Sequence, residues 1–204
     1  MPKISLTTEN STTLLTSSLR EHQEAIQALL DSQLDEIERA GRLICSTLAA
    51  GRKILLCGNG GSAADAQHIA AELVGQYEQP RRAFPAIALT TDTSALTAIS
   101  NDHGYEQVFA RQVEALAVAG DLLIAISTSG KSRNVIKAAE KARAIGCKII
   151  GLTGLAGEPL ASSCDTTIVV SAKRTARVQE AHITIGHLWC EMVDASIECP
   201  DGNP

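Results

Sequence analysis

Five short apolar runs, each followed by a longer amphipathic stretch, constrain the fold of this chain more than any other feature. Each run is bounded by Gly, Ser, Thr or Asp, as expected of buried strands. The runs are Lys53–Cys57, Pro85–Leu89, Leu122–Ser127, Lys148–Thr153 and Thr167–Val170. Helical spacing of apolar residues follows over 62–77, 94–118, 132–145 and 175–197. This alternation predicts parallel strands joined by crossover helices, and so an open three-layer α/β sheet of five strands.

A helical segment precedes this alternation. From about Thr12 to Ala50, apolar positions recur at helical spacing, which predicts two helices ahead of the sheet. Their pattern is consistent with an exposed apolar stripe that seeks a partner. At 204 residues the chain has room for one α/β domain and not comfortably for two. We therefore expect a single domain over residues 1–204, with a helical pair over 1–50 and an α/β core over 51–198.

Composition excludes several classes of function. Apolar residues make up 45% of the chain and charged residues 20%, as in typical soluble globular proteins. The net charge of −5 and the pI near 5.5 give no basic surface for nucleic acid. Aromatic residues, at 2%, leave little for stacking bases. We therefore expect no nucleic acid partner.

The cysteines and the apolar segments indicate the compartment. The six cysteines follow no C-x-x-C spacing, and most lie in apolar runs where a thiol behaves as a small hydrophobe. This pattern fits a reducing cytosol. The N-terminal residues lack an apolar export signal, and no run approaches the ~18 apolar residues of a membrane span. We expect a cytoplasmic protein that does not enter a membrane.

A glycine-rich loop follows the first apolar run, where an α/β sheet places its ligand. It reads Gly58-Asn59-Gly60-Gly61-Ser62 and leads directly into a predicted helix. Glycines let the backbone turn sharply and approach a ligand closely, and Ser62 with Asp65 resembles a helix-capping box. The loop is either a ligand floor or an ordinary strand-to-helix turn, with equal support for each.

A hydroxyl-rich loop follows the third run. It reads Ser127-Thr128-Ser129-Gly130-Lys131-Ser132 and precedes a helix that begins near Asn134. Hydroxyls, backbone donors and the positive end of a helix dipole together suit a phosphate group. The Walker A pattern is absent from the chain, so a nucleoside triphosphate is not implied. The alternative interpretation is that the serines only cap the helix.

Candidate acid, base and metal-ligating groups lie on two predicted helices. Asp65, His68 and Glu72 share one face of the first of them, where H-x-x-x-E can offer nitrogen and oxygen to one divalent ion. Gln179 and His187, about 80° apart on the last helix, can border one pocket. Periodicity cannot show whether the two helices meet.

Two further histidines are interpreted differently. His182 is rotated about 140° from His187 on the same helix, so we expect it to point elsewhere. It is interpreted as structural or surface, and His22 likewise.

Four motifs together resemble the phosphoheptose isomerase family, a branch of the sugar isomerase (SIS) domain superfamily. They are CGNGGSAADAQHIAAELVG, AIALTTDTSALTAISNDHGYEQVFARQV, AISTSGKSRNVIKAA and RVQEAHITIGH. The resemblance extends from about Ser18 to Ile197. It implies a homotetramer of flavodoxin-like subunits whose N-terminal helices join a central bundle, with active sites at subunit interfaces.

The resemblance also implies the site residues. One zinc ion per site would be held by His68, Glu72, Gln179 and His187. The phosphate would be held by Ser127, Thr128, Ser129 and Ser132, and the rest of the substrate by Asn59, Gly60, Gly61, Ser62, Asn101, Asp102 and Gln179. Asp65 matches a family acid close to the metal and is predicted to be catalytic with Glu72 and His187.

The implied reaction converts sedoheptulose 7-phosphate to D-glycero-D-manno-heptose 7-phosphate through an enediol or enediolate. This would be the first step toward ADP- or GDP-heptose precursors, for example of lipopolysaccharide. Glu72 is predicted to remove the carbon-bound proton while His187 serves the oxygens, or the reverse.

Two other functions remain open from the sequence. One is a non-catalytic adaptor that binds the replication initiator DnaA; this related branch has lost the catalytic pair that the present chain keeps in Glu72 and His187. The other is a sugar-phosphate sensor, whose expected DNA-reading domain is missing from the 204 residues.

Overall fold

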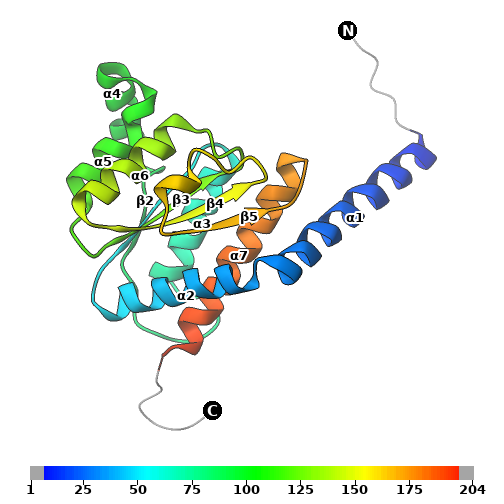
Figure 1. Ribbon diagram of the computed structural model, residues 1–204, viewed down its shortest axis with the longest axis horizontal. Coiled ribbons are helices and arrows are strands. Elements are labelled where there is room, and N and C mark those ends of the chain that lie inside the picture. The colour runs from blue at the N-terminus through cyan, green and yellow to red at the C-terminus, as the bar shows by residue number, and fades with distance from the viewer. Residues whose placement is uncertain (1–6, 198–204) are drawn as a thin grey trace.

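The computed structural model describes residues 7–197, which contain one five-stranded sheet (Figure 1). Its strands are β1 (Ile54–Cys57), β2 (Ala86–Ala88), β3 (Leu122–Ser127), β4 (Lys148–Gly154) and β5 (Thr166–Val170). All neighbouring strands are parallel, in the order β2-β1-β3-β4-β5. The predicted α/β class and five-stranded parallel sheet are therefore confirmed, with strand ends within one residue of the predicted ones.

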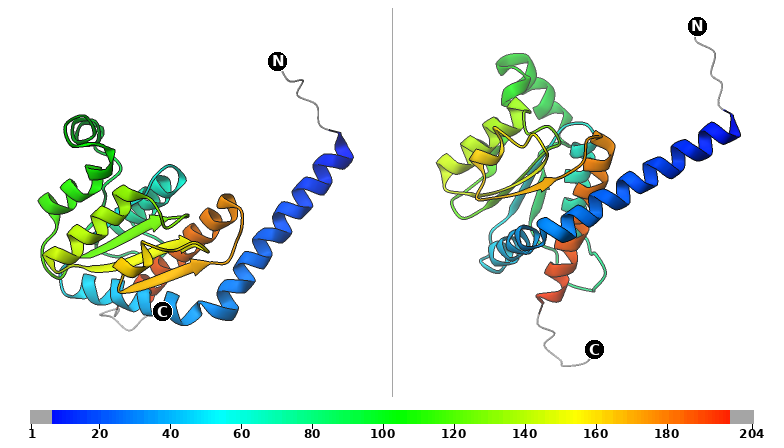
Figure 2. Two further views of the ribbon diagram at one scale, coloured as in Figure 1. Left: turned by 45° about the horizontal axis from the view of Figure 1, so that its top comes forward. Right: turned by 45° about the vertical axis from the view of Figure 1, so that its right-hand side comes forward.

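Helices cover both faces of the sheet and complete the three layers (Figures 1 and 2). The helices are α1 (Thr8–Ser32), α2 (Leu34–Ala49), α3 (Gly61–Val74), α4 (Thr93–His103), α5 (Val108–Leu116), α6 (Arg133–Ile145) and α7 (Thr175–Ala195). Short 3-10 turns occupy Tyr105–Gln107 (η1) and Ala161–Ser163 (η2). Buried side chains of α2, α3 and α7 form one apolar cluster with the sheet, and those of α5 and α6 form the other.

The single helix predicted over 94–118 is wrong, because the chain breaks there into α4, η1 and α5. Gly104 has a φ of +83°, a conformation that a residue with a Cβ rarely adopts and that cannot continue a right-handed helix. The apolar periodicity continues across the break, which is why the pattern alone suggests one helix.

The N-terminal helical pair is present, and α1 projects away from the sheet (Figure 2). Thr7 caps α1, because its hydroxyl accepts a hydrogen bond from the Asn10 backbone. Several leucines of the pair are more than half exposed: Leu14, Leu15, Leu19, Leu30 and Leu34. The expected apolar stripe therefore lies on the surface of this single chain.

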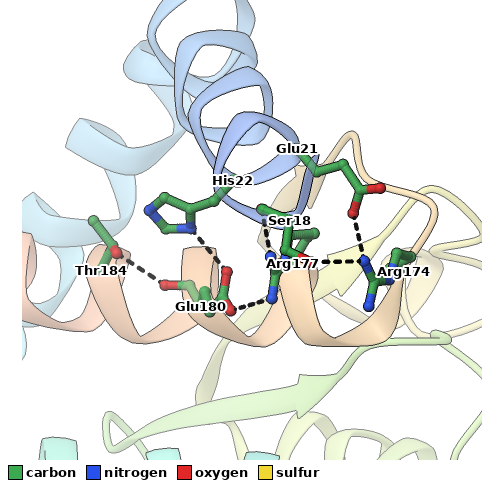
Figure 3. A network of polar contacts seen from close by, with 7 residues as sticks. All are labelled: Ser18, Glu21, His22, Arg174, Arg177, Glu180 and Thr184. Atoms are coloured by element: carbon green, nitrogen blue, oxygen red, sulfur yellow. Dashed lines mark hydrogen bonds and ion pairs between the residues drawn. The ribbon is translucent and has the colours of Figure 1, made fainter. Parts of the chain in front are cut away.

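Polar contacts attach α1 to the first turns of α7 (Figure 3). Arg177 donates to the backbone carbonyl of Ser18, and Arg174 donates to Glu21 at 3.0 Å. His22 Nδ1 lies 2.8 Å from Glu180 Oε2, so this half-buried histidine has a structural partner. The orientation of α1 is thus tied to the helix that carries Gln179 and His187.

The described cysteines are free thiols: Cys45, Cys57, Cys147, Cys164 and Cys190. Burial raises the pKa of Cys164 to about 11 and of Cys190 to about 12, which makes both poor nucleophiles. Cys199 lies outside the described residues. Across residues 7–197, none of the helices combines the length and hydrophobicity needed to cross a bilayer.

Candidate functional site

The carboxyl ends of β1 and β3 are neighbours, since Cys57 pairs with Ala125 in the sheet. Each strand leads into one of the two loops singled out from the sequence. In an open parallel sheet, ligands bind in the crevice outside these ends. The glycine-rich loop and the hydroxyl-rich loop therefore lie side by side at the edge where a ligand is expected.

The glycine-rich loop turns tightly into α3. A Cβ at Gly58 would lie 2.6 Å from the carbonyl oxygen of Ser62, so only glycine fits there. Gly60, with a φ of +57°, is the N-cap of α3. The predicted capping box of Ser62 and Asp65 is wrong, because the helix begins at Gly61 and its N-cap has no side-chain hydrogen bond. Ser62 instead lies buried in the first turn.

The start of α7 lies against this loop. A Cβ at Gly61 would lie 2.5 Å from Nε2 of Gln179, so the amide of Gln179 packs directly on the Gly61 backbone. Gln179 thus lies beside the glycine-rich loop, and its role as a ligand of metal or substrate stays a prediction. Gly61 is required for this close approach, because any side chain would displace the amide.

Helices α3 and α7 meet farther along, at the predicted acid–base and metal groups. His68 Nε2 lies 2.9 Å from His187 Nε2 and 3.3 Å from Glu72 Oε1. The two imidazole ring centroids are 5.0 Å apart. Gly186 makes the approach possible, since a Cβ there would lie 2.6 Å from Cδ1 of Ile69. Glu72 and His187, 115 positions apart in the sequence, are therefore joined through His68.

The donor types in this cluster fit a zinc ion, although their spacing does not yet match one. Within the described residues, no group of three or more His, Cys, Asp or Glu side chains has the arrangement of a metal site. Both short contacts run through His68 Nε2. Tetrahedral zinc with Zn–N bonds of about 2.0–2.1 Å separates two nitrogen ligands by about 3.4 Å. The His68 and His187 rings would therefore have to move apart by a few tenths of an ångström.

Asp65, one turn before His68, carries an unpartnered carboxylate. Its Oδ2 is buried and has no hydrogen-bond partner among the residues that the structure describes. Burial raises the pKa of Asp65 to about 6, with the charge of His68 acting in the opposite direction. A group of this kind can exchange protons near neutral pH, which suits the predicted acid role.

We expect Asp65→Asn to change how stability depends on pH. The folded state binds the Asp65 proton more tightly than the unfolded chain, so this group stabilises the fold below about pH 4 and loses that contribution as pH rises through about 6. The variant should gain melting temperature relative to wild type from pH 4 to pH 8, measured by thermal unfolding of metal-free protein. Asp35→Asn, an exposed residue on α2, is the control. If the difference in melting temperature between Asp65→Asn and wild type does not vary with pH, the pKa of Asp65 is not raised in the folded protein.

The N-cap side chain of the hydroxyl-rich loop does not cap α6. Ser132 is the N-cap residue, yet its side chain makes no capping hydrogen bond and instead accepts one from Ser127 Oγ at 3.0 Å. Ser129 Oγ accepts from the Lys131 backbone at 3.2 Å and is exposed. The alternative that these serines only cap the helix is therefore not supported. Among residues 7–197, the hydroxyls of Ser129 and Ser132 accept hydrogen bonds but donate none to the protein.

Gly130 sets the shape of this loop. Its φ is +66°, and a Cβ there would overlap the carbonyl of Gly157. The Gly130 carbonyl accepts from the Leu160 backbone at 3.1 Å, and the Thr128 carbonyl accepts from Gly154 at 3.1 Å. The loop is therefore held against the segment that follows β4, which fixes the hydroxyls relative to the sheet.

Asn101 and Asp102 lie on the last turn of α4. Both are exposed, and Asn101 Nδ2 donates to Asp102 Oδ1 at 2.8 Å. Among residues 7–197, neither side chain is hydrogen-bonded to either loop or to the His68 cluster. Their role in substrate binding stays a prediction.

Of the two interpretations of His182, structural or surface, the structure supports the structural one. It is fully buried, and its Nε2 lies 3.2 Å from the carbonyl oxygen of Thr153. Burial lowers the pKa of His182 to about 4, so the ring is neutral at physiological pH. It contributes to the packing of α7 on β4 and does not reach the His68 cluster.

A buried ion pair that was not predicted from the sequence stabilises the backbone next to Glu72. Arg81 and Asp194 form a buried ion pair at 2.7 Å. Arg81 also donates to the backbone carbonyls of Glu72 and Leu73, and Asp194 accepts from the backbone of Glu78 and Gln79. The pair thus ties the end of α3, the following loop and α7 together. A signal was available, since Asp194 lies among the apolar positions of the last helix.

Three more missed residues lie at the site. Tyr77 packs on His187, with ring centroids 5.7 Å apart. Asn134 and Tyr105 are both hydrogen-bonded to Asn59 in the glycine-rich loop. Asn134 is a buried polar residue directly after the hydroxyl-rich loop, which was a usable signal, whereas nothing in the sequence singles out the Tyr105 hydroxyl.

Comparisons with known proteins agree on one family. The SIS domain family model matches residues 19–154. The phosphoheptose isomerase of Aliarcobacter butzleri is 57% identical over 173 residues, covering 85% of this chain and 92% of that protein. The one from Nitratiruptor sp. is 54% identical over 178 residues, covering 87% of this chain and 95% of that protein.

Solved structures agree with the sequence comparison. Phosphoheptose isomerase GmhA from Neisseria gonorrhoeae matches with a TM-score of 0.82 and 45% identity, covering 92% of this chain and 98% of that chain. A phosphoheptose isomerase from Francisella tularensis matches with a TM-score of 0.88 and 35% identity, covering 91% and 99%. The Vibrio vulnificus NanR protein, at 19% identity and a TM-score of 0.63, shares the fold alone.

Proposed function

The chain belongs to the phosphoheptose isomerase family of SIS-domain proteins, and on that premise we propose that it converts sedoheptulose 7-phosphate to D-glycero-D-manno-heptose 7-phosphate. The observation that carries the proposal is the meeting of α3 and α7, which brings His187 within 2.9 Å of His68 and Glu72 within 3.3 Å of the same nitrogen. A non-catalytic adaptor is not favoured, because both members of the acid–base pair are retained and adjacent.

Isomerisation of a ketose to an aldose moves one proton between C1 and C2 and another between their oxygens, through an enediol. Glu72 is the proposed base for the carbon-bound proton, or His187 if the two roles are exchanged; the 3.3 Å contact of the Glu72 carboxylate with His68 supports a fixed position for this group. His187 lies on the opposing helix and serves the sugar oxygens. Two groups on opposite helices allow proton transfer at two atoms of one substrate.

The residues that would hold a zinc ion are His68, Glu72, Gln179 and His187. When bound, the ion would polarise the sugar carbonyl as a Lewis acid. Support for this proposal comes from the donor chemistry of His68, Glu72 and His187, which meet at His68 Nε2. Gln179 is included because the family resemblance implies it.

The phosphate is proposed to bind at Ser127–Ser132, where it supplies binding energy that orients the reacting end of the sugar. We expect Ser129→Ala to raise KM for sedoheptulose 7-phosphate by about 10- to 150-fold, the range for losing one hydrogen bond to a charged group, with little change in kcat. Steady-state kinetics measure both constants. An unchanged KM would argue against this placement of the phosphate. Ser162→Ala, on η2, is the control because, within the part of the chain that the structure describes, its hydroxyl donates only to the Pro159 carbonyl.

A homotetramer in the cytoplasm, with active sites at subunit interfaces, is the proposed assembly. Exposed leucines along α1, including Leu15, Leu19 and Leu30, support it because an apolar stripe of this kind usually packs against a partner. The proposed product is a precursor of nucleotide-activated heptose, for example for lipopolysaccharide.

The decisive assay incubates purified, zinc-replete protein with sedoheptulose 7-phosphate and reduces the mixture with borodeuteride. Fragment mass spectrometry then detects the aldoheptose 7-phosphate, because the deuterium enters at C1 of an aldose and at C2 of a ketose. Removing metal with a chelator should abolish product formation, and added zinc should restore it. Absence of product from folded, zinc-loaded protein would refute the isomerase proposal and favour the adaptor or sensor.

A further inference from the structure

We infer that Asn134 and Tyr105 are positioning residues that fix the side-chain amide of Asn59, so that Asn59 offers the substrate a hydrogen-bond donor and not an acceptor. The inference deepens the proposed function and rests on it, because the recipient is an oxygen of the bound sugar phosphate. It follows from hydrogen bonds that join three segments: the glycine-rich loop, η1 and the start of α6.

The first step is the orientation of Asn134, which is buried at the start of α6. The Val135 backbone N–H lies 3.0 Å from Asn134 Oδ1. A backbone N–H can only donate, so the atom that faces it must be the amide oxygen. The amide nitrogen of Asn134 then necessarily points to Asn59.

The second step is the orientation of Asn59. Asn134 Nδ2 donates to Asn59 Oδ1 at 2.8 Å, and Asn59 Nδ2 donates back to Asn134 Oδ1 at 2.9 Å. Tyr105 adds a second donor, with its hydroxyl 2.9 Å from Asn59 Oδ1. The oxygen of Asn59 therefore receives two donors from the protein, and reversing the amide would place nitrogen against nitrogen.

The third step concerns the remaining hydrogen. An amide nitrogen carries two hydrogens, and the reciprocal pair with Asn134 uses one of them. No other acceptor among residues 7–197 is within hydrogen-bond distance of Asn59 Nδ2. Asn59 is only partly buried, and a Cβ at the following Gly60 would meet no atom within 4 Å. The N–H that the pair with Asn134 leaves unused is therefore available to a ligand at the edge of the sheet where β1 and β3 end.

The recipient must be an oxygen with a lone pair, and a sugar phosphate offers such atoms in its phosphate, hydroxyl and carbonyl groups. Asn59 follows β1 and the hydroxyl-rich loop follows the adjacent strand β3, so one substrate can contact both loops. The consequence is specific: a change that removes a donor to Asn59 Oδ1 should weaken substrate binding although Asn59 itself is unchanged.

The test uses two variants of the full-length, zinc-loaded protein. Asn134→Asp still accepts from the Val135 N–H but places a carboxylate oxygen against Asn59 Oδ1 where wild type has a donor, so the reciprocal pair breaks and the Asn59 amide is no longer held in one orientation. KM for sedoheptulose 7-phosphate should rise about 10-fold or more, with kcat within about threefold of wild type. Tyr105→Phe keeps the exposed ring and removes one donor, so KM should rise by about two- to fivefold.

Glu106→Gln is the matched control. Glu106 follows Tyr105 and pairs with Lys137, so the variant loosens the same η1–α6 contact without touching Asn59. Its KM should equal that of wild type. If Glu106→Gln raises KM as much as Tyr105→Phe does, loosened packing explains the effect and the inference fails. It also fails if both Asn134→Asp and Tyr105→Phe leave KM unchanged.

Calorimetric binding of sedoheptulose 7-phosphate separates this inference from the isomerase proposal. Wild-type protein that binds the sugar without turnover would refute the isomerase, and the same variants would then test the inference through Kd. Wild-type protein that neither binds nor turns over the sugar would overturn both. Should Asn134→Asp fail to fold, Tyr105→Phe and Glu106→Gln decide the matter, because both changes are on the surface or half-buried.

Discussion

Replacing Glu72 by Gln is expected to lower kcat for sedoheptulose 7-phosphate by about 10³-fold with the fold intact. A positioned general base contributes on the order of 10²–10⁴ to the rate, and Gln has nearly the same shape but cannot accept a proton. Folding should survive because the Glu72 side chain is only partly buried and its backbone carbonyl remains bonded to Arg81. Steady-state kinetics give kcat, and circular dichroism with thermal unfolding checks the fold.

Two measurements make the Glu72→Gln result decisive. Zinc content is determined in parallel, because Glu72 is also a proposed ligand; a loss of turnover with zinc retained assigns the effect to proton transfer. Glu140→Gln, an exposed carboxylate on α6, should behave as wild type. Nearly normal turnover in Glu72→Gln would remove this residue from the mechanism.

Asp194→Ala is expected to lower the free energy of unfolding by about 3–5 kcal/mol, the usual cost of leaving one member of a buried ion pair without its partner. The Arg81 and Asp194 side chains are 1% and 5% exposed, so water cannot replace the missing carboxylate. The backbone N–H groups of Glu78 and Gln79 would also lose their acceptor. Chemical denaturation measures the change.

Asp194→Ala should also loosen the backbone that carries Glu72 in the candidate site. Arg81 bonds to the carbonyls of Glu72 and Leu73, so freeing its guanidinium loosens the end of α3 from which the Glu72 side chain extends. Glu38→Ala, which removes an exposed pair with Arg42, should cost under about 1 kcal/mol. A loss equally small for Asp194→Ala would show that the Arg81 pair does not stabilise the fold.

Local features of the sequence were enough to predict the helices, the strands and the positions of the glycine-rich and hydroxyl-rich loops. Strands occur where a short apolar run lies between turn-forming residues, because a parallel strand buried on both faces of the sheet requires continuous apolar residues. Helix α3 was predicted from periodicity, and so was the shared face of His68 and Glu72. The break at Gly104 had a local signal, a glycine, but the apolar periodicity on either side outweighed it.

Local patterns of residues are therefore sufficient to predict the helices and strands and the chemistry of the loops between them. The tertiary structure alone decided which side chains meet: His68 with His187 across 119 positions, Arg81 with Asp194 across 113, and Asn59 with Asn134 across 75. Periodicity reports only which face of an element is apolar. Contacts between distant elements depend instead on close packing, such as the fit of Ile69 against Gly186, which is a property of the folded core and not of any one segment.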